Sequence, residues 1–237
     1  PRGVVRLLSE VFAEMVFCQG FVHCDPHPGN VLIRRRGARG MQLVLLDHGL
    51  YRTVPDDLRT DYCKLWKGIV LADVEGIKAA SRALGIRSPW MEKTFPGLDV
   101  THTMIAAMLT AKEWVEIADP AARLDRFDRK GTAEQEKAKL SANVADYAQG
   151  ILDVLETCPR DLLLLLKTND ALRSAAGRLG GCSADTFVVT AKSCIRALWL
   201  QRSGAGLWWR RVLHRLHLAV AYGRCHTFQL LQDATDR

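Results

Sequence analysis

The stretch that decides the fold covers residues 21–50 and reads FVHCDPHPGNVLIRRRGARGMQLVLLDHGL. Its first ten residues crowd two histidines, an aspartate, two prolines, a glycine and an asparagine together, and this composition excludes a regular helix. Residues 31–33 and 42–46 are apolar runs on either side of a basic turn with two glycines, so they predict a β-hairpin over 31–46. An Asp-His-Gly triplet at 47–49 follows the hairpin directly.

The polar residues of this stretch have the spacing that phosphoryl transfer needs. Asp25 precedes Asn30 by five positions, and Asp47 comes one step after the hairpin. The reaction needs a carboxylate beside the attacking hydroxyl and oxygen ligands for Mg²⁺ on the β- and γ-phosphates. Protein kinases use an Asp, an Asn five residues later, and a second Asp before a Gly that follows a hairpin. The spacing therefore predicts a site for ATP and Mg²⁺, with Gly49 at a sharp turn.

Helical patterns flank the stretch on both sides. Apolar residues at helical spacing predict a helix over 4–17, with Gly20 as its stop. Residues 53–56 resemble a capping box with a proline inside the first helical turn. Further helices are predicted at about 55–70, 73–84, 100–117, 140–157, 160–178, 184–201 and 207–231. One hairpin followed by helices indicates an α+β fold and argues against a doubly wound sheet.

Composition limits the partners that the chain can have. A net charge of +7 fits a negatively charged partner such as a nucleotide, an anionic membrane or nucleic acid. The sequence has no recognisable nucleic-acid-binding motif, so we expect no nucleic acid partner. The seven cysteines are scattered without metal-ligand spacing, which is typical of buried thiols in a reducing compartment. No apolar run reaches the ~18 residues of a membrane-spanning helix.

The motif string resembles a known family. His23-x-Asp25-x-His27-Pro28-Gly29-Asn30, followed by Asp47-x-Gly49, is similar to the UbiB family of atypical kinases, also called aarF-domain or ADCK kinases. The flanking residues 20–23, 43–51 and 159–170 resemble the mitochondrial animal branch. The resemblance covers about residues 1–200. It implies a protein-kinase-like fold, here the mostly helical C-terminal lobe, with the hairpin carrying the metal site.

The resemblance also implies roles for single residues. Asp25 matches the catalytic aspartate, Asn30 and Asp47 match the magnesium ligands, and Gly49 completes the nucleotide site. The residues that shape the loop in support of these are His23, His27, Pro28 and Gly29. His48 stands where most kinases have phenylalanine, and this departure puts the usual phenylalanine-driven switching in doubt.

Other family features are absent from these 237 residues. The nucleotide-gripping lysine, the Ala-rich phosphate loop and the Lys-x-Gly-Gln extension belong to the N-terminal lobe, which we expect before Pro1. The chain alone is therefore expected to bind nucleotide weakly and to catalyse little. The family resemblance implies a mitochondrial location and a role in lipid or ubiquinone homeostasis.

Two alternatives stay open. Small-molecule phosphotransferases of the aminoglycoside or choline kinase type also use His-x-Asp with a downstream Asn and a second Asp. They usually continue with an aromatic or acidic residue after that second Asp, where this chain has His48 and Gly49. The other alternative is a catalytically inactive pseudokinase scaffold, against which the retained Asp25, Asn30 and Asp47 argue.

The last segment, 201–237, is predicted to be a basic amphipathic helix. Between Gln201 and Arg224 the sequence has five arginines and no acidic residue, and Trp209, Leu213, Leu216 and Val220 share one helical face. This pattern suits a helix lying on an anionic membrane or lipid surface. An ordinary C-terminal helix packed on the domain is the alternative. The leucine run at 162–166 is too short to span a bilayer, so we expect it in the core.

Overall fold

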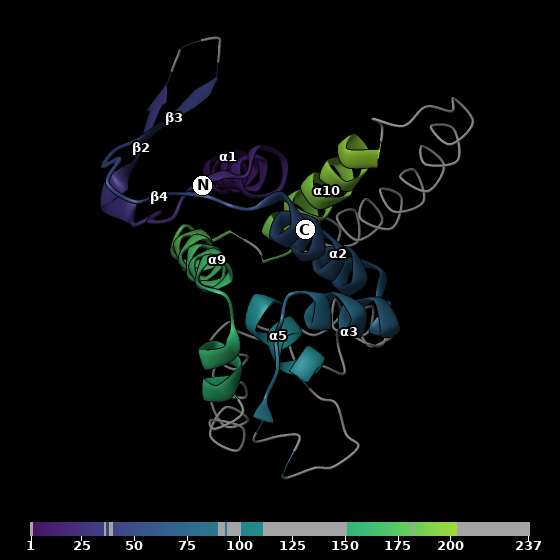
Figure 1. Cartoon of the computed structure of the whole chain (residues 1–237). Helices are drawn as coiled ribbons and strands as arrows, with labels where there is room; N and C mark the ends of the chain where they lie inside the picture. The colour runs from purple at the N-terminus through teal and green to yellow at the C-terminus, as the bar shows by residue number, and fades with distance from the viewer. Residues whose placement is uncertain are drawn as a thin grey trace, which may run out of the picture.

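The computed structural model describes residues 2–35, 37, 40–89, 93, 101–110, 151–181 and 183–202. The helices are α1 (Arg2–Ala13), η1 (Glu14–Gln19), η2 (Pro28–Asn30), α2 (Asp56–Leu71), α3 (Val74–Ala83), α5 (Thr101–Thr110), α9 (Arg160–Arg178) and α10 (Ser183–Arg202). The strands are β1 (Phe21–His23), β2 (Val31–Arg35), β3 (Met41–Leu45) and β4 (Tyr51–Thr53). Helices with two small antiparallel sheets match the predicted α+β composition (Figure 1).

The first helix ends where its sequence predicts. After Ala13 the backbone widens into the π-helical segment η1, and Gly20 stops it in the left-handed conformation with φ 68°. The Gly20 N–H donates to the Met15 carbonyl at 2.8 Å, so the end of the helix is capped. Single π-helical turns inside α-helices often lie next to functional sites. Here η1 is followed in the chain by β1 and then by the loop that begins at Cys24.

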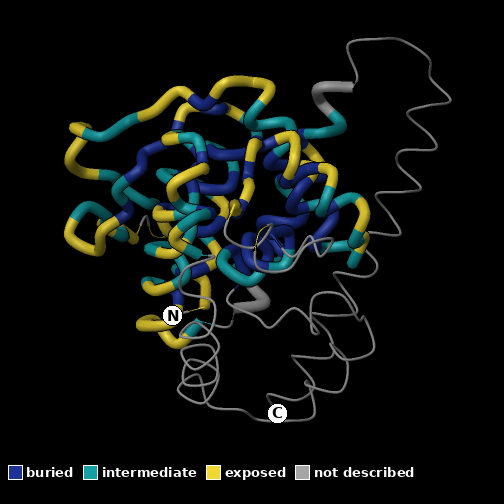
Figure 2. Tube along the Cα trace, turned by 60° about the horizontal axis from the view of Figure 1, so that its bottom comes forward, coloured by how far each residue is buried: buried dark blue, intermediate teal, exposed yellow. Residues whose placement is uncertain are grey.

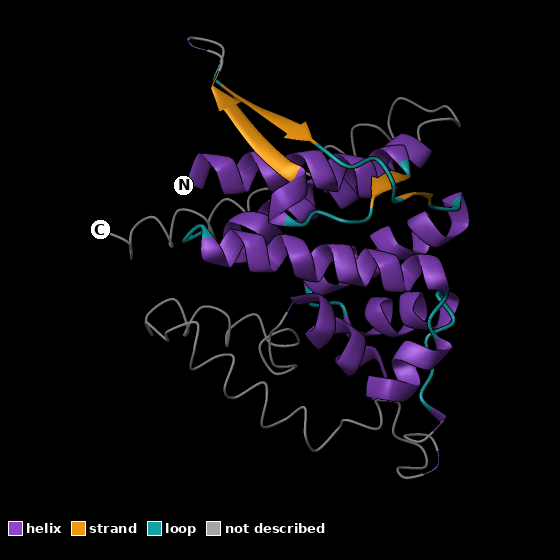
Figure 3. Cartoon of the chain, turned by 90° about the vertical axis from the view of Figure 1, so that its left-hand side faces the viewer, coloured by secondary structure: helices purple, strands orange, loops and turns teal. Residues whose placement is uncertain are grey.

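The hairpin predicted over 31–46 is confirmed. β2 pairs with β3 in antiparallel register, from Val31 opposite Leu45 to Arg35 opposite Met41. It projects from the helices in two views, with Arg34 and Arg35 exposed near its tip (Figure 1, Figure 3). The sequence analysis missed the second sheet, in which β1 pairs with β4 and His23 lies opposite Tyr51. Its strands have three residues each, too few for alternation to stand out.

The capping box predicted at 53–56 is wrong. Thr53 belongs to β4, and Pro55 occupies the N-cap of α2 without a side-chain hydrogen bond. The strand pairing of Thr53 with Phe21 holds its backbone extended and away from the helix end. Asp56 and Asp57 in the first turn instead place negative charge at the positive end of the helix dipole.

The other predicted helices agree with the structure where it describes them. The predictions for 55–70, 73–84, 160–178 and 184–201 correspond to α2, α3, α9 and α10. Within the prediction for 100–117, residues 101–110 form α5, and within that for 140–157, residues 151–157 are helical. The rest of these two segments and the predicted helix at 207–231 lie outside the described residues, as does most of the segment 201–237.

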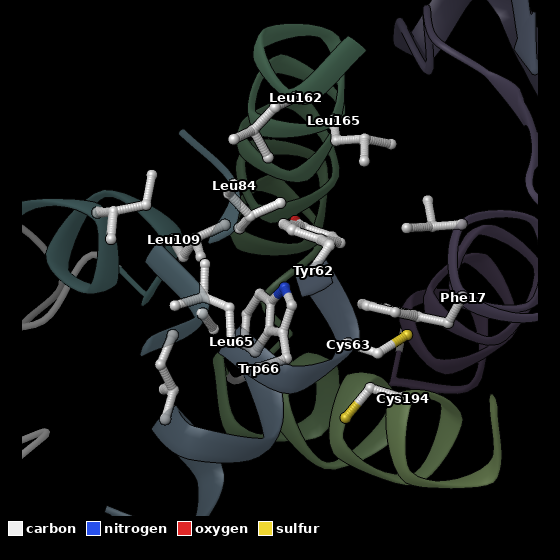
Figure 4. Close-up of a cluster of buried hydrophobic side chains, with 14 of the residues drawn as sticks. Phe17, Tyr62, Cys63, Leu65, Trp66, Leu84, Leu109, Leu162, Leu165 and Cys194 are labelled. Carbon is white, nitrogen blue, oxygen red and sulfur yellow. The ribbon is translucent and has the colours of Figure 1, made fainter. Parts of the chain in front are cut away.

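The core lies around α2, which packs against α3 and α10. Leu65, Cys63 and Ile69 of α2 are fully buried, and Tyr62 stacks on Phe17 at 5.6 Å between ring centroids. Figure 4 shows Leu162 and Leu165 of α9 above this group, so the leucine run enters the core as predicted. Buried residues concentrate among the helices, whereas the hairpin is half-buried or exposed (Figure 2).

Two further predictions can be checked within the described residues. Five cysteines there are free thiols, and four of them, Cys24, Cys63, Cys158 and Cys194, are buried, in line with the prediction. In the part of the chain that the structure describes, none of the helices combines the length and the apolar character needed to cross a bilayer.

Candidate functional site

The loop after β1 is anchored by a buried histidine. His23 is 0% exposed, and both of its ring nitrogens are hydrogen-bonded. Its Nδ1 accepts from the Asp25 N–H at 3.1 Å, and its Nε2 lies 3.2 Å from the Leu46 carbonyl oxygen. Because a carbonyl can only accept, these partners assign the ring proton to Nε2. His23 therefore ties the backbone of Asp25 to the residue that precedes Asp47.

A side chain that accepts a hydrogen bond from the backbone N–H two residues later, as His23 does, occurs twice more. The His27 Nδ1 accepts from the Gly29 N–H at 3.1 Å, and the Asp47 Oδ1 accepts from the Gly49 N–H at 3.1 Å. In each case a side chain bonds the backbone two residues later, as in an Asx turn. A Cβ added at Gly29 or Gly49 would lie 3.2 or 3.1 Å from the accepting atom. Glycine therefore lets both turns close tightly.

Asp25 and Asn30 are in direct contact. The Asn30 Nδ2 donates to the Asp25 backbone oxygen at 3.2 Å and to its carboxylate Oδ2 at 3.3 Å. The short 3₁₀ helix η2 supports this geometry, with the Asn30 N–H bonded to the His27 carbonyl at 2.7 Å and Pro28 at its first position. The structure thus brings two sequence-predicted residues together, with the amide nitrogen of Asn30 on the carboxylate.

The residue before Asp47 is bonded to the backbone of Asn30. The Leu46 N–H donates to the Asn30 carbonyl at 2.8 Å, which extends the hairpin ladder to the residue before Asp47. Asp47 itself is exposed and adopts a left-handed backbone with φ 55°. Such a conformation is uncommon for a residue other than glycine and persists where the surroundings enforce it. The Gly49 N–H is bonded to the Asp47 Oδ1, and the Asp47 Oδ2 is left as an oxygen ligand for a metal ion.

Two contacts hold the loop to the rest of the molecule. The Cys24 N–H donates to the Leu50 carbonyl at 3.0 Å, continuing the pairing of β1 with β4. The buried Thr168 of α9 places its hydroxyl 3.5 Å from the Cys24 carbonyl and 2.8 Å from the Leu164 carbonyl. Sequence reasoning missed Thr168, whose only signal was its place after the leucine run. Burial raises the pKa of the Cys24 thiol, which is unfavourable for a nucleophile.

The polar residues that follow Thr168 are half-buried or exposed, and Asn169 and Arg173 bond the backbone of α5. Asp170 is exposed, and Asn169 and Arg173 are half-buried. Asn169 donates to the Leu109 carbonyl at 2.8 Å, and Arg173 donates to the Met108 and Leu109 carbonyls at 3.3 and 3.2 Å. These side chains therefore tie α9 to the backbone of α5.

The donor set at the loop fits magnesium better than a transition metal. Within the described ranges, no group of three or more His, Cys, Asp or Glu side chains is arranged to hold a metal ion. Asn30 and Asp47 instead offer an amide oxygen and a carboxylate oxygen. Mg²⁺ prefers such hard oxygen ligands and is commonly held by one or two protein groups together with phosphate oxygens and water. The residues present therefore fit Mg²⁺ carried on a nucleotide.

The loop site lies in a segment that matches a kinase-like domain. The family model that matches is the ABC1 atypical kinase-like domain, over residues 1–81, which contain the whole loop site. The chain is 38% identical over 227 residues to the AarF domain-containing protein kinase 1 of Mus musculus, covering 94% of this chain. The Gallus gallus protein of the same name is 35% identical over 96% of the chain, and the AarF domain-containing kinase 1 of Drosophila melanogaster is 32% identical over 91%.

The chain belongs to the ABC1/AarF family of atypical kinase-like proteins. It spans about two fifths of the length of the mouse, chicken and fly relatives, with 40%, 41% and 40% of each covered. No solved structure matches the chain.

Proposed function

We propose that the loop site binds Mg²⁺-ATP and acts in an atypical kinase or ATPase. The observation that carries this proposal is the Asn30–Asp25 contact. The Asn30 Nδ2 donates to the Asp25 carboxylate, and because a carboxylate only accepts hydrogen bonds, the amide oxygen of Asn30 has no bond to make with it. The Asn30 Oδ1 is thereby left as a ligand next to the residue that would receive the acceptor hydroxyl.

Each residue then has a chemical task. Asp25 would accept a hydrogen bond from the acceptor hydroxyl and orient it, because a positioned carboxylate is what phosphoryl transfer needs there. Asn30 and Asp47 would hold Mg²⁺ through Oδ1 and Oδ2. When bound, Mg²⁺ neutralises charge on the ATP phosphates. Gly49 closes the turn that presents Asp47, and His23 keeps Asp25 and Leu46 at a fixed separation.

The proposal extends to the phosphate acceptor, the cellular setting and the N-terminal lobe that would grip the nucleotide. The acceptor would be water, a lipid-derived hydroxyl or a protein hydroxyl, in a mitochondrial role in lipid or ubiquinone homeostasis. Family resemblance supports this setting. The nucleotide-gripping lobe would be supplied by sequence upstream of Pro1, and the greater length of the relatives supports that view.

An anionic membrane is proposed as a second partner. The support is in the sequence, since residues 201–224 carry five arginines and no acidic residue. Co-sedimentation with neutral and anionic vesicles tests it. Binding to anionic vesicles alone supports the proposal, and equal binding to both, or to neither, overturns it.

The proposal is tested by Mg²⁺-dependent ATP binding and hydrolysis. The 237-residue chain and a polypeptide extended upstream of Pro1 are compared, each with its Asp47→Ala variant. We expect the extended protein to bind more tightly. Asp47→Ala should weaken Mg²⁺-dependent binding by more than about 100-fold, because even outer-shell partners of a metal are worth about 10–100-fold.

Asp57→Ala provides the matched control, since Asp57 is also an exposed aspartate but lies at the start of α2. It removes the same charge and should leave binding near the wild-type value. If the folded extended protein neither binds nor hydrolyses ATP, the enzyme proposal fails and the pseudokinase scaffold takes its place. Transfer to a free aminoglycoside or choline would instead favour the small-molecule phosphotransferase.

A further inference from the structure

A column of aromatic rings stands beside the proposed metal ligands. Phe21 stacks on Tyr51 with centroids 4.8 Å apart and an interplanar angle of 20°. Tyr51 in turn lies nearly parallel to His48, with centroids 5.7 Å apart and an angle of 19°. Phe21 comes from β1 and Tyr51 from β4, as diagonal neighbours on one face of that sheet. The rings therefore form one column from the strand pair to the turn at Asp47.

The column is fixed at the His48 end by a hydrogen bond. The Tyr51 hydroxyl lies 3.1 Å from the His48 Nδ1. His48 is exposed, so burial alone does not hold its ring in place. The bond and the stacking together define the ring orientation of a residue that directly follows Asp47.

The same column touches the anchor of the loop. Tyr51 lies edge-on to His23 at 5.1 Å between centroids, with an interplanar angle of 63°. His23 is buried, and its two nitrogens are bonded to the Asp25 N–H and the Leu46 carbonyl. Tyr51 therefore contacts both the histidine that holds Asp25 and the histidine that follows Asp47.

The position of His48 explains why such a device is needed. Most kinases have a phenylalanine there, which is fixed by packing in an apolar environment. His48 is polar and exposed and cannot be fixed in that way. Asp47 nevertheless keeps a left-handed backbone with φ 55°, which the surrounding structure must enforce.

We infer that Tyr51 is a positioning residue for the metal site: through its hydrogen bond and stacking on His48, it holds the Asp47-His48-Gly49 turn in its ligand-presenting conformation. This role rests on the proposed function of Asp47 as a magnesium ligand. It assigns to a His–Tyr pair the task that an apolar ring performs in kinases with phenylalanine at that position.

The first test does not require a nucleotide. Backbone hydrogen exchange at residues 46–50 is compared between the full chain and its Tyr51→Phe variant, which keeps the stacked ring and loses only the hydroxyl. We expect faster exchange at Gly49, whose N–H donates to the Asp47 Oδ1. The Leu46 amide serves as the internal reference, because it is bonded to the Asn30 carbonyl in the hairpin ladder and should not change. Unchanged exchange at Gly49 overturns the inference.

The second test is a double-mutant cycle on Mg²⁺-dependent ATP binding. Tyr51→Phe and His48→Phe should each weaken binding by about 2- to 10-fold, the value of one hydrogen bond. Because they remove the same bond, the double variant should be no weaker than either single variant. Binding without Mg²⁺ should not change, whereas a general loss of folding would lower both.

The outcomes separate the two proposals. If the folded wild-type protein extended upstream of Pro1 binds no Mg²⁺-ATP but the exchange difference is present, the proposed function fails while Tyr51 still holds the turn. If the wild-type protein binds and the effects of Tyr51→Phe and His48→Phe are additive, the two side chains act independently and the inference is wrong.

Discussion

Around α2, side chains such as Leu65 and Cys63 are fully buried and packed against the neighbouring helices, whereas Asp47, His48 and Gly49 are exposed to water. The core is held by apolar contact, which depends on area and shape. The loop is held by bonds from side chains to backbone groups two residues away, as at His27 and Asp47. Truncating a side chain in the core should therefore lower the free energy of unfolding, whereas truncating one in the loop should disturb the geometry of the proposed ligands.

The largest effect is expected from a truncation in the core. Leu65→Ala removes a fully buried side chain from α2 and should lower the free energy of unfolding by about 2–5 kcal/mol. Urea denaturation measures the change. Leu32→Ala is the matched control, since Leu32 is 51% exposed on the hairpin. It should alter stability by less than about 0.5 kcal/mol. Equal losses in the two variants would contradict the assignment of the core to the helices.

A smaller effect is expected at the junction of the two regions. His23→Leu leaves the Asp25 N–H and the Leu46 carbonyl, which face the buried His23 ring, without their partner, and a polar group left unpaired in a buried position costs about 1–3 kcal/mol. We expect a loss of about 2–3 kcal/mol in the free energy of unfolding. His27→Leu removes a single bond at an exposed ring and should cost less than about 1 kcal/mol. Comparable losses in both would mean that the burial of His23 does not matter.

The helical core was largely predictable because its signal is periodic. Residues 4–17 and 160–178 repeat apolar side chains at helical spacing over several turns, and Gly20 ends the first helix as expected. Periodicity fails where elements are short. β1 and β4 have three residues each. Their pairing holds Thr53 in a strand, away from the start of α2, where the sequence predicts a capping box.

For the candidate site, the sequence predicts a set of residues but not the contacts that support them. The spacing of Asp25, Asn30 and Asp47 follows from what phosphoryl transfer needs, and the structure places Asn30 on Asp25. The left-handed backbone at Asp47 and the hydroxyl of Tyr51 on His48 depend on strand register and turn geometry. Thr168 reaches Cys24 from 144 residues away in the chain, and such a contact leaves no local pattern.

A third effect is a pH dependence that again separates the regions. Burial raises the pKa of the Cys63 thiol from its usual value of 9.0 to about 12. Between these values the unfolded chain loses the proton while the folded chain keeps it. The contribution of the protonated Cys63 thiol to the free energy of unfolding is therefore complete below pH 9. It is lost as pH rises toward 12, by up to about 1.4 kcal/mol for each pH unit.

The test is the difference in unfolding free energy between the wild type and Cys63→Ala across pH 8–11. Other titrating groups cancel in this difference, so it should be flat to pH 9 and then shift in favour of the variant. Cys158→Ala is the companion, because burial raises the pKa of the Cys158 thiol to about 11, and its shift should level off earlier. A difference that stays constant to pH 11 would mean that water reaches Cys63. The part of α2 around Cys63 would then not belong to a core from which water is excluded.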